Sequence, residues 1–486
     1  MNIIPKINGP ITWTGEEATF TLPLAYEGDC PFDDQFPLTA NGVPVLHLTQ
    51  DASLAPEAYH ISIQPNSITL AAAAKAGTYY GLQTLCRLLQ EGQGKLPCGE
   101  LSDAPRYEHR GLSFDVVRHF FGADEVKKIL AQCAKLKINR FHWHLSDDQG
   151  FRIESKRYPL LNGQQQNRGY YTQEEIRDIV CFAAEHQIEI IPEIDLPGHT
   201  RAIIAAYPQY SCTEEPTVPA AKGGIYREIL CAGKEEVYEF LFDLLDEVSE
   251  LFPGPYFHIG GDEAPKKNWK ACPHCQAKIK AEGLKDEEEL QAHFTKRLID
   301  FLKTKGKTVI AWNEAAASGT LDDSAIVQYW MDMGRGYCAE EAKKGRKFIY
   351  SKFTSFYLDY PHNMVSLKAM YESEPITLRG DVLPEEQVLG LEAALWTERY
   401  STNEQIERKL FPRLLALAEN AWTNQKDYHD FVKRAKAQET YWQQDGFAYT
   451  LMEDADLDGK KGLKRLKDMP GKLLIRMVLS WMRKSK

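Results

Sequence analysis

The sequence contains no run of about twenty apolar residues, the length that a membrane-spanning helix requires. Its first residues also lack the long apolar stretch of a secretory signal peptide, so we expect a cytoplasmic protein. Basic residues are fewer than acidic residues, and the 486 residues carry a net charge of −11. Phosphate binding needs clustered positive charge, and we therefore expect no nucleic-acid partner.

Cysteine is also sparse, since ten residues in a chain of this length do not form a disulfide framework. Most lie in apolar runs, where a free thiol behaves as a small hydrophobic side chain. The segment Cys272-Pro-His-Cys275 differs, because two cysteines at this spacing form half of a zinc site or a redox pair. The sequence shows no second CxxC and no matching HxxxH, which favours two reduced thiols in a loop. We expect no metal and no cofactor.

The positive charge that is present concentrates near the end of the chain. Ten Lys or Arg and a single acid, Asp468, lie between Lys460 and Lys486. Within this tail, residues 472–484 mix apolar and basic side chains, a pattern that allows contact with an anionic membrane surface. A terminal helix docked on the body of the protein explains the same pattern, and we favour that interpretation.

The length predicts two or three domains. Residues 58–63 alternate in the manner of a half-buried strand, and residues 71–90 are predicted to be helical. Both belong to an N-terminal α/β domain, and the polar stretch 91–106 is expected to be a linker. We divide the chain into this domain (1–105), a central domain (106–425) and a C-terminal helical segment with the basic tail (426–486).

Short buried strands alternate with amphipathic helices in the central domain. The predicted helices are 123–136, 173–187, 235–251, 287–304 and 402–422. The eight predicted strands are 111–116, 140–146, 188–195, 256–263, 308–314, 325–330, 347–351 and 389–398. This alternation predicts a parallel sheet, and eight strands predict a closed (β/α)₈, or TIM, barrel.

The chemistry of such a barrel lies at the C-terminal ends of its strands. Those ends carry acids, one arginine and three tryptophans in this sequence: Arg118, Asp147, Asp148, Glu193, Asp195, His199, Asp262, Glu263, Trp312, Glu314, Trp330, Tyr357, Asp359, Trp396 and Glu398. Flat aromatic rings cover the faces of a sugar, and charged groups bind its hydroxyls. The composition of the rim therefore favours a carbohydrate site.

The neighbouring carboxylates of Asp262 and Glu263 follow an apolar run and two glycines. Mutual repulsion and burial raise the cost of ionising both. Such pairs occur at functional sites and also in structural ion networks, so the pair alone leaves both interpretations open. His142 and His144 flank Trp143 with alternating spacing, and we expect them to be core histidines without a catalytic role.

Five segments in order resemble the signature blocks of family-20 glycoside hydrolases, the β-N-acetylhexosaminidases. They are 115–121, 141–152, 193–199, 258–263 and 395–398. Residues 76–85 resemble the family's small α/β domain, so the resemblance covers roughly residues 1–425 and excludes the basic tail. Phe151 stands where the family often has Trp, a change expected to alter packing rather than chemistry.

The resemblance implies an exo-acting β-N-acetylhexosaminidase that retains configuration. Its substrates would be oligosaccharides or glycoconjugates with a terminal non-reducing β-linked N-acetylhexosamine, mainly GlcNAc and also GalNAc. In this family the substrate's own acetamido group is the nucleophile and forms an oxazolinium ion. Glu263 would be the general acid and base, Asp262 would stay ionised and accept the acetamido N–H, and Tyr357 would donate to its carbonyl oxygen. His199 and Asp147 would form a proton-handling pair behind Glu263.

The resemblance also implies a set of substrate-binding residues. Trp312, Trp330 and Trp396 would wall the pocket. Arg118 would bind the hydroxyls O3 and O4, and Asp359 with Glu398 would bind those near O4 and O6. Asp195 would support Arg118 or the adjacent loop.

Three alternatives stay open at this stage. One is a lacto-N-biosidase-type enzyme that releases disaccharides. The depth of the pocket decides between this activity and the release of a single sugar. Another is a metal-dependent hydrolase, although the sequence has no HExxH or similar ligand spacing. The third is a non-catalytic glycan-binding protein. The sequence does not predict the oligomeric state.

Overall fold

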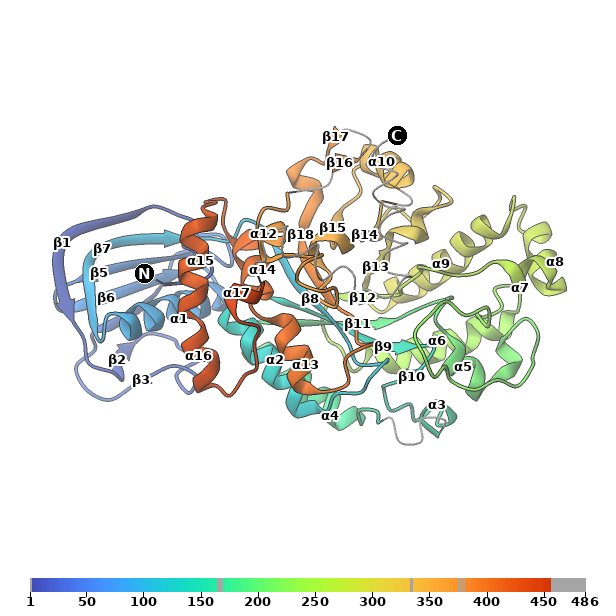
Figure 1. Cartoon of the computed structure of the whole chain (residues 1–486), viewed down its shortest axis with the longest axis horizontal. Helices are drawn as coiled ribbons and strands as arrows, with labels where there is room; N and C mark the ends of the chain where they lie inside the picture. Colours follow the sequence, from blue (N-terminus) through green and yellow to red (C-terminus); the bar gives the residue numbers. More distant parts are fainter. Residues whose placement is uncertain (1, 164–168, 333–334, 375–376, 379–380, 456–486) are drawn as a thin grey trace.

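The computed structural model describes residues 2–163, 169–332, 335–374, 377–378 and 381–455. A seven-stranded sheet forms the N-terminal part, drawn in blue in Figure 1, with the strand order β1-β7-β5-β6-β4-β2-β3. Helix α1 (Lys75–Glu91) packs on it and buries Tyr80, Leu82 and Leu85 in the core of this part. The strands are β1 (Ile11–Thr19), β2 (Leu24–Glu27), β3 (Leu38–Thr39), β4 (Leu46–Gln50), β5 (Tyr59–Gln64), β6 (Ser67–Ala72) and β7 (Lys95–Asp103).

Two expectations for this part are wrong. The predicted linker 91–106 contains β7, which pairs with β1 on one side and β5 on the other. Leu96 and Cys98 face the core, and Leu101 does so after a shift of phase at Gly99, so the period-two alternation is interrupted. The Gly and Pro residues obscured the strand further. The predicted helix from residue 71 begins only at Lys75, because residues 71 and 72 end strand β6.

The central domain is a closed barrel of eight parallel strands, as predicted. Strands β9, β11, β12, β13, β14, β15, β18 and β8 are neighbours in that order, and pairing of β8 with β9 closes the circle. Their bounds are β8 (His109–Asp115), β9 (Arg140–Asp147), β11 (Glu189–Ile194), β12 (Tyr256–His258), β13 (Thr308–Trp312), β14 (Ile326–Tyr329), β15 (Phe348–Tyr350) and β18 (Val388–Leu395). The short strands β10 (Gly150–Phe151), β16 (Thr377–Leu378) and β17 (Asp381–Val382) lie outside the barrel.

Helices follow the barrel strands along the chain. They are α2 (Ala123–Lys135), α3 (Leu160–Gly163), α4 (Gln173–Glu185), α5 (Arg201–Ala206), α6 (Glu235–Ser249), α7 (Lys267–Ala271), α8 (Pro273–Ala281), α9 (Glu287–Thr304), α10 (Arg335–Lys343), α11 (Phe353–Phe356), α12 (Leu367–Tyr371), α13 (Asn403–Leu410) and α14 (Arg413–Trp422), with 3₁₀ turns η1 (Pro208–Tyr210), η2 (Asn313–Ala316) and η3 (Glu385–Gln387). The predicted helix 402–422 is two helices, because Pro412 has no amide N–H to continue α13. The other four predicted helices are confirmed.

The barrel interior is layered. Ile191, Ile310, Ile326 and Ile349 form an apolar layer, and Glu193, Trp312, Gln328 and Ser351 lie two residues further along the same strands. In this polar layer Glu392 contacts His109 and His142, each at 2.8 Å, and Glu193 lies 3.1 Å from His142. Burial lowers the pKa of His142, but the charges of Glu392 and Glu193 outweigh it and raise it to about 10. His142 and His144 are buried beside acids, as expected of core histidines, and His144 contacts Glu193 and Asp147.

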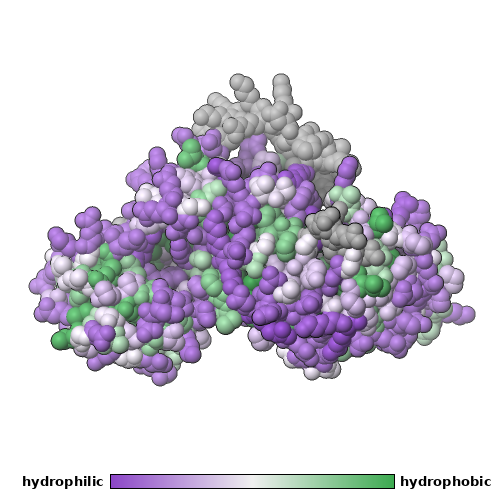
Figure 2. Space-filling model, turned by 90° about the horizontal axis from the view of Figure 1, so that it is seen from below, coloured by the Kyte–Doolittle hydropathy of each residue, from purple (hydrophilic) through white to green (hydrophobic). Residues whose placement is uncertain are grey.

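Helices α15 (Tyr428–Ala437), α16 (Glu439–Gln444) and α17 (Met452–Ala455) lie between the sheet and the barrel (Figure 1). Arg434 joins the two parts, because it bonds the Ile3 carbonyl and pairs with Glu419 of α14. No described helix is long and apolar enough to cross a membrane. The face seen in Figure 2 is mostly hydrophilic, with apolar residues scattered over it. The basic tail and its predicted docking lie outside the described residues.

Candidate active site

A cavity of ≈ 450 Å³ opens at the C-terminal ends of the barrel strands. Ten of the predicted site residues line it: Arg118, Asp195, His199, Asp262, Glu263, Trp330, Tyr357, Asp359, Trp396 and Glu398. They come from six different strand ends, so the barrel fold alone brings together residues that are far apart in the sequence. Asp147 and Trp312, the other two predicted residues, lie outside this lining.

The backbone before Asp262 is bent to bring the two carboxylates into the cavity. Strand β12 ends at His258 rather than at the predicted residue 263, because Gly260 and Gly261 adopt φ of +65° and +100°. A Cβ on Gly260 would stand 1.8 Å from Oδ1 of Asp195, so only glycine fits there. Glu263 itself has φ of +45°, an uncommon conformation for a side chain of its size that occurs at functional sites.

Asp195 supports this loop. Its Oδ1 accepts a hydrogen bond of 3.0 Å from the Gly261 amide, directly before Asp262. The next loop also contributes, because Glu314 accepts from the Glu263 amide at 3.2 Å. Asp195 was expected to support either Arg118 or the adjacent loop, and the structure shows its contact with the loop.

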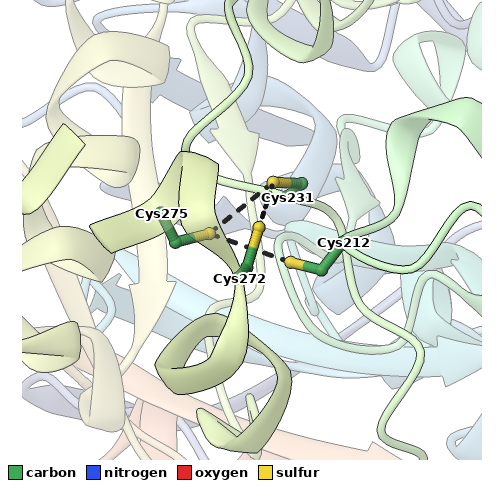
Figure 3. A group of neighbouring side chains, drawn as sticks. All are labelled: Cys212, Cys231, Cys272 and Cys275. Atoms are coloured by element: carbon green, nitrogen blue, oxygen red, sulfur yellow. Dashed lines mark hydrogen bonds between the residues drawn. The ribbon is translucent and has the colours of Figure 1, made fainter. Parts of the chain in front are cut away.

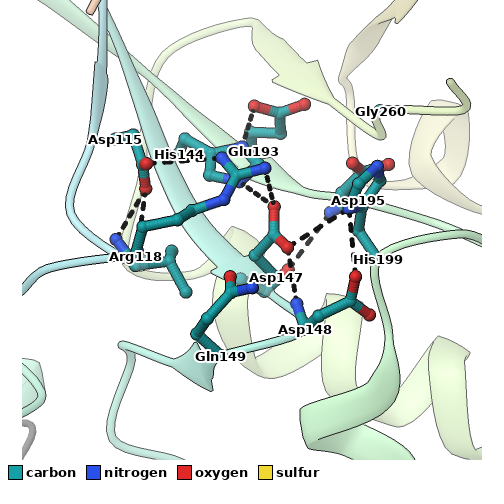
Figure 4. A network of polar contacts seen from close by, with 12 residues as sticks. Asp115, Arg118, His144, Asp147, Asp148, Gln149, Glu193, Asp195, His199 and Gly260 are labelled. Atoms are coloured by element: carbon teal, nitrogen blue, oxygen red, sulfur yellow. Dashed lines mark hydrogen bonds and ion pairs between the residues drawn. The ribbon is translucent and has the colours of Figure 1, made fainter. Parts of the chain in front are cut away.

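His199 lies between Glu263 and the buried carboxylates of Asp147 and Asp148, and Figure 4 shows these two carboxylates beside it. Its Nε2 lies 3.8 Å from Oε2 of Glu263, and its Nδ1 lies 3.2 Å from Asp147 and 3.3 Å from Asp148. Burial alone would lower the pKa of His199, but the charge of Asp147 dominates and holds it well above the ordinary value. The predicted His199–Asp147 pair is thus present, and the neighbouring carboxylates favour the protonated form of its imidazole.

Arg118 is fixed at the side of the cavity by two acids. Its guanidinium lies 2.7 Å from Asp147 and 3.3 Å from Asp115, and it stands 5.0 Å from the ring centre of Trp396. Against the effect of burial, these carboxylates hold the pKa of Arg118 well above its ordinary value. A rigid, permanently charged fork of this kind binds vicinal hydroxyls in a set orientation.

Aromatic rings also line the cavity. Tyr357 stacks on Trp330 with 6.0 Å between ring centres, and it stands at the same distance from Trp396. Trp312 is placed differently from the prediction. It is buried beneath Trp396, with 6.0 Å between the rings, and its Nε1–H donates to Glu193 at 2.8 Å. It therefore holds Trp396 from below instead of lining the cavity.

Several acids in the cavity resist ionisation. Burial, reinforced by Glu398, raises the pKa of Asp359 to about 8. Burial and the charge of Glu263, opposed by His199, raise the pKa of Asp262 to about 6. The expectation of an ionised Asp262 therefore holds only above about pH 6. Among the described residues, its buried Oδ1 has no hydrogen-bond partner.

Sequence reasoning missed some members of the site. Asp148 was placed at a strand end but given no role, yet it contacts His199. Glu314 was noted at a strand end without a role, and burial with the charge of Asp262 raises its pKa to about 8. The run of two acids at 147–148 was the available signal for Asp148, since adjacent acids at a strand end rarely both point to solvent.

Comparison with known proteins gives the family of this chain. The model of the glycosyl hydrolase family 20 catalytic domain matches residues 107–425, and the model of the family's domain 2 matches residues 13–104. The chain belongs to glycosyl hydrolase family 20. The resemblance inferred from the five sequence blocks is thus confirmed.

Individual relatives agree with this family. A β-hexosaminidase of Porphyromonas gingivalis is 38% identical over 410 residues, which are 78% of this chain. The chain spans about half of that curated relative, 52% of its length. The solved β-N-acetylhexosaminidase of Bacteroides fragilis has a TM-score of 0.83 and 31% identity, covering 94% of this chain and 99% of its own. An exo β-N-acetylglucosaminidase of Vibrio harveyi, solved with N-acetylglucosamine, has a TM-score of 0.83 and 28% identity, covering 93% and 78%.

Proposed function

We propose that this family-20 member is an exo-acting β-N-acetylhexosaminidase that removes terminal β-linked GlcNAc, and also GalNAc, with retention of configuration. The observation that carries the proposal is the arrangement around Asp262. Its buried Oδ1 has no partner among the described residues, and the Tyr357 ring lies between Trp330 and Trp396 beside it. A carboxylate acceptor next to a phenol donor matches the N–H and C=O of an acetamido group.

The cavity also supports an exo mode of action. Its volume of ≈ 450 Å³ suits a single sugar ring, within the range of small-molecule sites. Asp359 and Glu398 line the cavity. Gly223 packs against Glu398 and narrows the cavity at that point. A Cβ on Gly223 would stand 2.6 Å from Cγ of Glu398. These groups would bind the outer hydroxyls of a terminal residue, together with Arg118.

The proposed first step uses the substrate as its own nucleophile. The acetamido oxygen attacks the anomeric carbon while the glycosidic C–O bond breaks, and Glu263 gives its proton to the leaving oxygen. Asp262, ionised, accepts the N–H and stabilises the oxazolinium cation, and Tyr357 orients the attacking oxygen. Alignment of a nucleophile by such contacts removes much of the entropic cost of the reaction.

In the proposed second step Glu263 acts as a base. It takes a proton from water, whose oxygen attacks the anomeric carbon and restores the acetamido group. Two displacements at one carbon retain its configuration. The protonated His199, 3.8 Å from Glu263, would favour the anion that forms on Glu263 when it gives up its proton.

The test compares an aryl N-acetyl-β-glucosaminide with the plain aryl β-glucoside. We expect hydrolysis of the acetamido substrate only, lost in Asp262→Asn and Glu263→Gln. Glu282→Gln, the same change at an exposed carboxylate, is the matched control and should retain activity. Cleavage of both substrates would contradict the proposed nucleophile. Cleavage of an aryl disaccharide alone would indicate a lacto-N-biosidase-type enzyme.

Two further sequence expectations stay predictions. Cell fractionation tests the cytoplasmic location. Deletion of the residues after 458, followed by liposome co-sedimentation, tests whether the basic tail contacts a membrane, and unchanged sedimentation would remove that idea.

A further inference from the structure

Four cysteines from separate parts of the chain meet beside the barrel (Figure 3). Cys212 and Cys231 lie at the two ends of a long loop after α5, next to the β-bridge between Ser211 and Leu230. Cys272 precedes helix α8, and Cys275 lies in its first turn. Cys231, Cys272 and Cys275 are buried, and Cys212 is half-buried. Buried thiols that point at one another, from two different loops, need a physical reason.

We propose that these four thiolates bind one structural Zn²⁺. The sulfur of Cys231 lies 3.6 Å from that of Cys275 and 3.7 Å from that of Cys272, and Cys212 lies 3.8 Å from Cys275. All four sulfurs lie within 4.8 Å of one another. Sulfurs at about 2.3 Å from a tetrahedral Zn²⁺ are ~3.8 Å apart.

These distances do not fit disulfides. A disulfide brings two sulfurs to about 2.05 Å, and all four cysteines are free in the structure. Cys231 also has two sulfur neighbours at nearly equal distance, which a pairwise bond does not explain. A single ion at the centre of the four explains all the short distances together.

The backbone around the cluster is built for close approach. Gly233 packs directly on the turn that contains the CxxC, because a Cβ there would stand 2.3 Å from the amide nitrogen of Cys275. Its own amide donates a hydrogen bond to the sulfur of Cys231. Amide donors to sulfur offset the negative charge of a zinc site with four thiolates. Lys234 bonds the Ser211 carbonyl next to Cys212 and pairs with Glu214.

The ion would connect two loops that reach the active-site cavity. The loop between Cys212 and Cys231 contains Gly223 and Ile225, which line the cavity, and the segment before Cys272 begins at Glu263. Trp269 already ties the two loops, since its Nε1–H donates to the Leu230 carbonyl at 2.9 Å. Zinc would therefore fix the wall of the cavity relative to the loop that carries Glu263.

The sequence alone favoured reduced thiols at Cys272 and Cys275, because no second CxxC accompanies them. The missing ligands are single cysteines, Cys212 and Cys231, which only the fold brings beside the motif. The proposal does not rest on the proposed reaction, because these four residues are separate from the cavity lining.

The test is the metal content of the tag-free full-length protein, measured by elemental mass spectrometry. We expect one zinc per chain, released in equal amount when a mercurial titrates the thiols. The double variant Cys272→Ser/Cys275→Ser should lose the zinc, and Cys338→Ser, a buried cysteine outside the cluster, should keep it. Replacement by Co²⁺ should give the charge-transfer and d–d bands of a tetrahedral tetrathiolate, which requires no variant to fold.

Three results would overturn the proposal. The first is a metal-free protein whose four thiols all react in the native state. The second is a protein that contains iron in place of zinc. The third is an intact mass lower by four hydrogens, which indicates two disulfides. Loss of zinc should also lower the unfolding temperature, because a structural metal contributes its binding free energy to folding. These readouts do not depend on hydrolysis, so failure of this proposal is distinguishable from failure of the proposed function.

Discussion

Replacing His199 with glutamine removes the cation that faces both carboxylates of the proposed reaction. The interacting atoms of His199 and Asp262 lie within 4.8 Å of each other. At that distance two unit charges interact by about 3.5 kcal/mol at an effective dielectric constant of about 20. This energy corresponds to a change of about 2.5 in the pKa of Asp262.

The direction of the effect follows from the charges. Protonated His199 favours the ionised form of Asp262 and lowers its pKa, which is about 6 in the intact site. Without the imidazolium, the pKa of Asp262 rises. Since the ionised form is the one that supports the oxazolinium ion, the acidic limb of the kcat/KM profile should move from near pH 6 to a higher pH by roughly 1 to 2.5 pH units.

The assay is kcat/KM for an aryl N-acetyl-β-glucosaminide across the acidic and neutral range. His186→Gln is the matched control, because this histidine is remote from the cavity and bonds only its own helix through the Phe182 carbonyl. It should leave the profile unchanged. An acidic limb that stays in place in His199→Gln, or moves to lower pH, would refute the electrostatic role of His199.

Three other changes test separate parts of the site. Glu263→Gln should lower kcat by about 10²–10⁴ for glycosides with poor leaving groups and much less for those with acidic phenols, because only the former need protonation; equal losses in both series would argue against a general acid. Tyr357→Phe should lower kcat by roughly 10²–10³ with little change in KM, since one donor to the reacting oxygen is lost; an unchanged kcat would remove that role. Gly260→Ala should lower the unfolding temperature and the activity, because its Cβ meets Asp195 at 1.8 Å, whereas Gly283→Ala, with a similar φ of +66° and open space, should do far less. Calorimetry of both variants measures the difference.

The sequence predicted the barrel well because its signals are local. Most of the eight strands are short segments rich in apolar residues, and polar or helical segments flank them and mark their limits. The rule that strand ends carry the chemistry then placed ten residues in one cavity without any contact information. Errors arose where one residue type broke a pattern: the Gly and Pro of β7 resembled a linker, and Pro412 divided a helix that periodicity alone extended.

The sequence did not predict how deeply a side chain is buried or which residues distant in the chain it contacts. Trp312 lies at a strand end like Trp330 and Trp396, but the packing of the barrel layers decides that it supports Trp396 from below. The pKa of Asp262 depends on Glu263 next to it and on His199, which belongs to another strand end. The four-cysteine cluster has the same origin, because Cys212 and Cys231 carry no motif of their own.

The central claim is that the substrate's acetamido oxygen is the nucleophile. The most direct measurement is kcat/KM for aryl glucosaminides whose N-acetyl group carries one, two or three fluorine atoms. Each fluorine withdraws electrons from the carbonyl oxygen and weakens it as a nucleophile, so the account predicts a steep and regular fall along the series. Rates that do not respond to fluorination would mean that a carboxylate of the protein attacks the sugar, and would contradict the account.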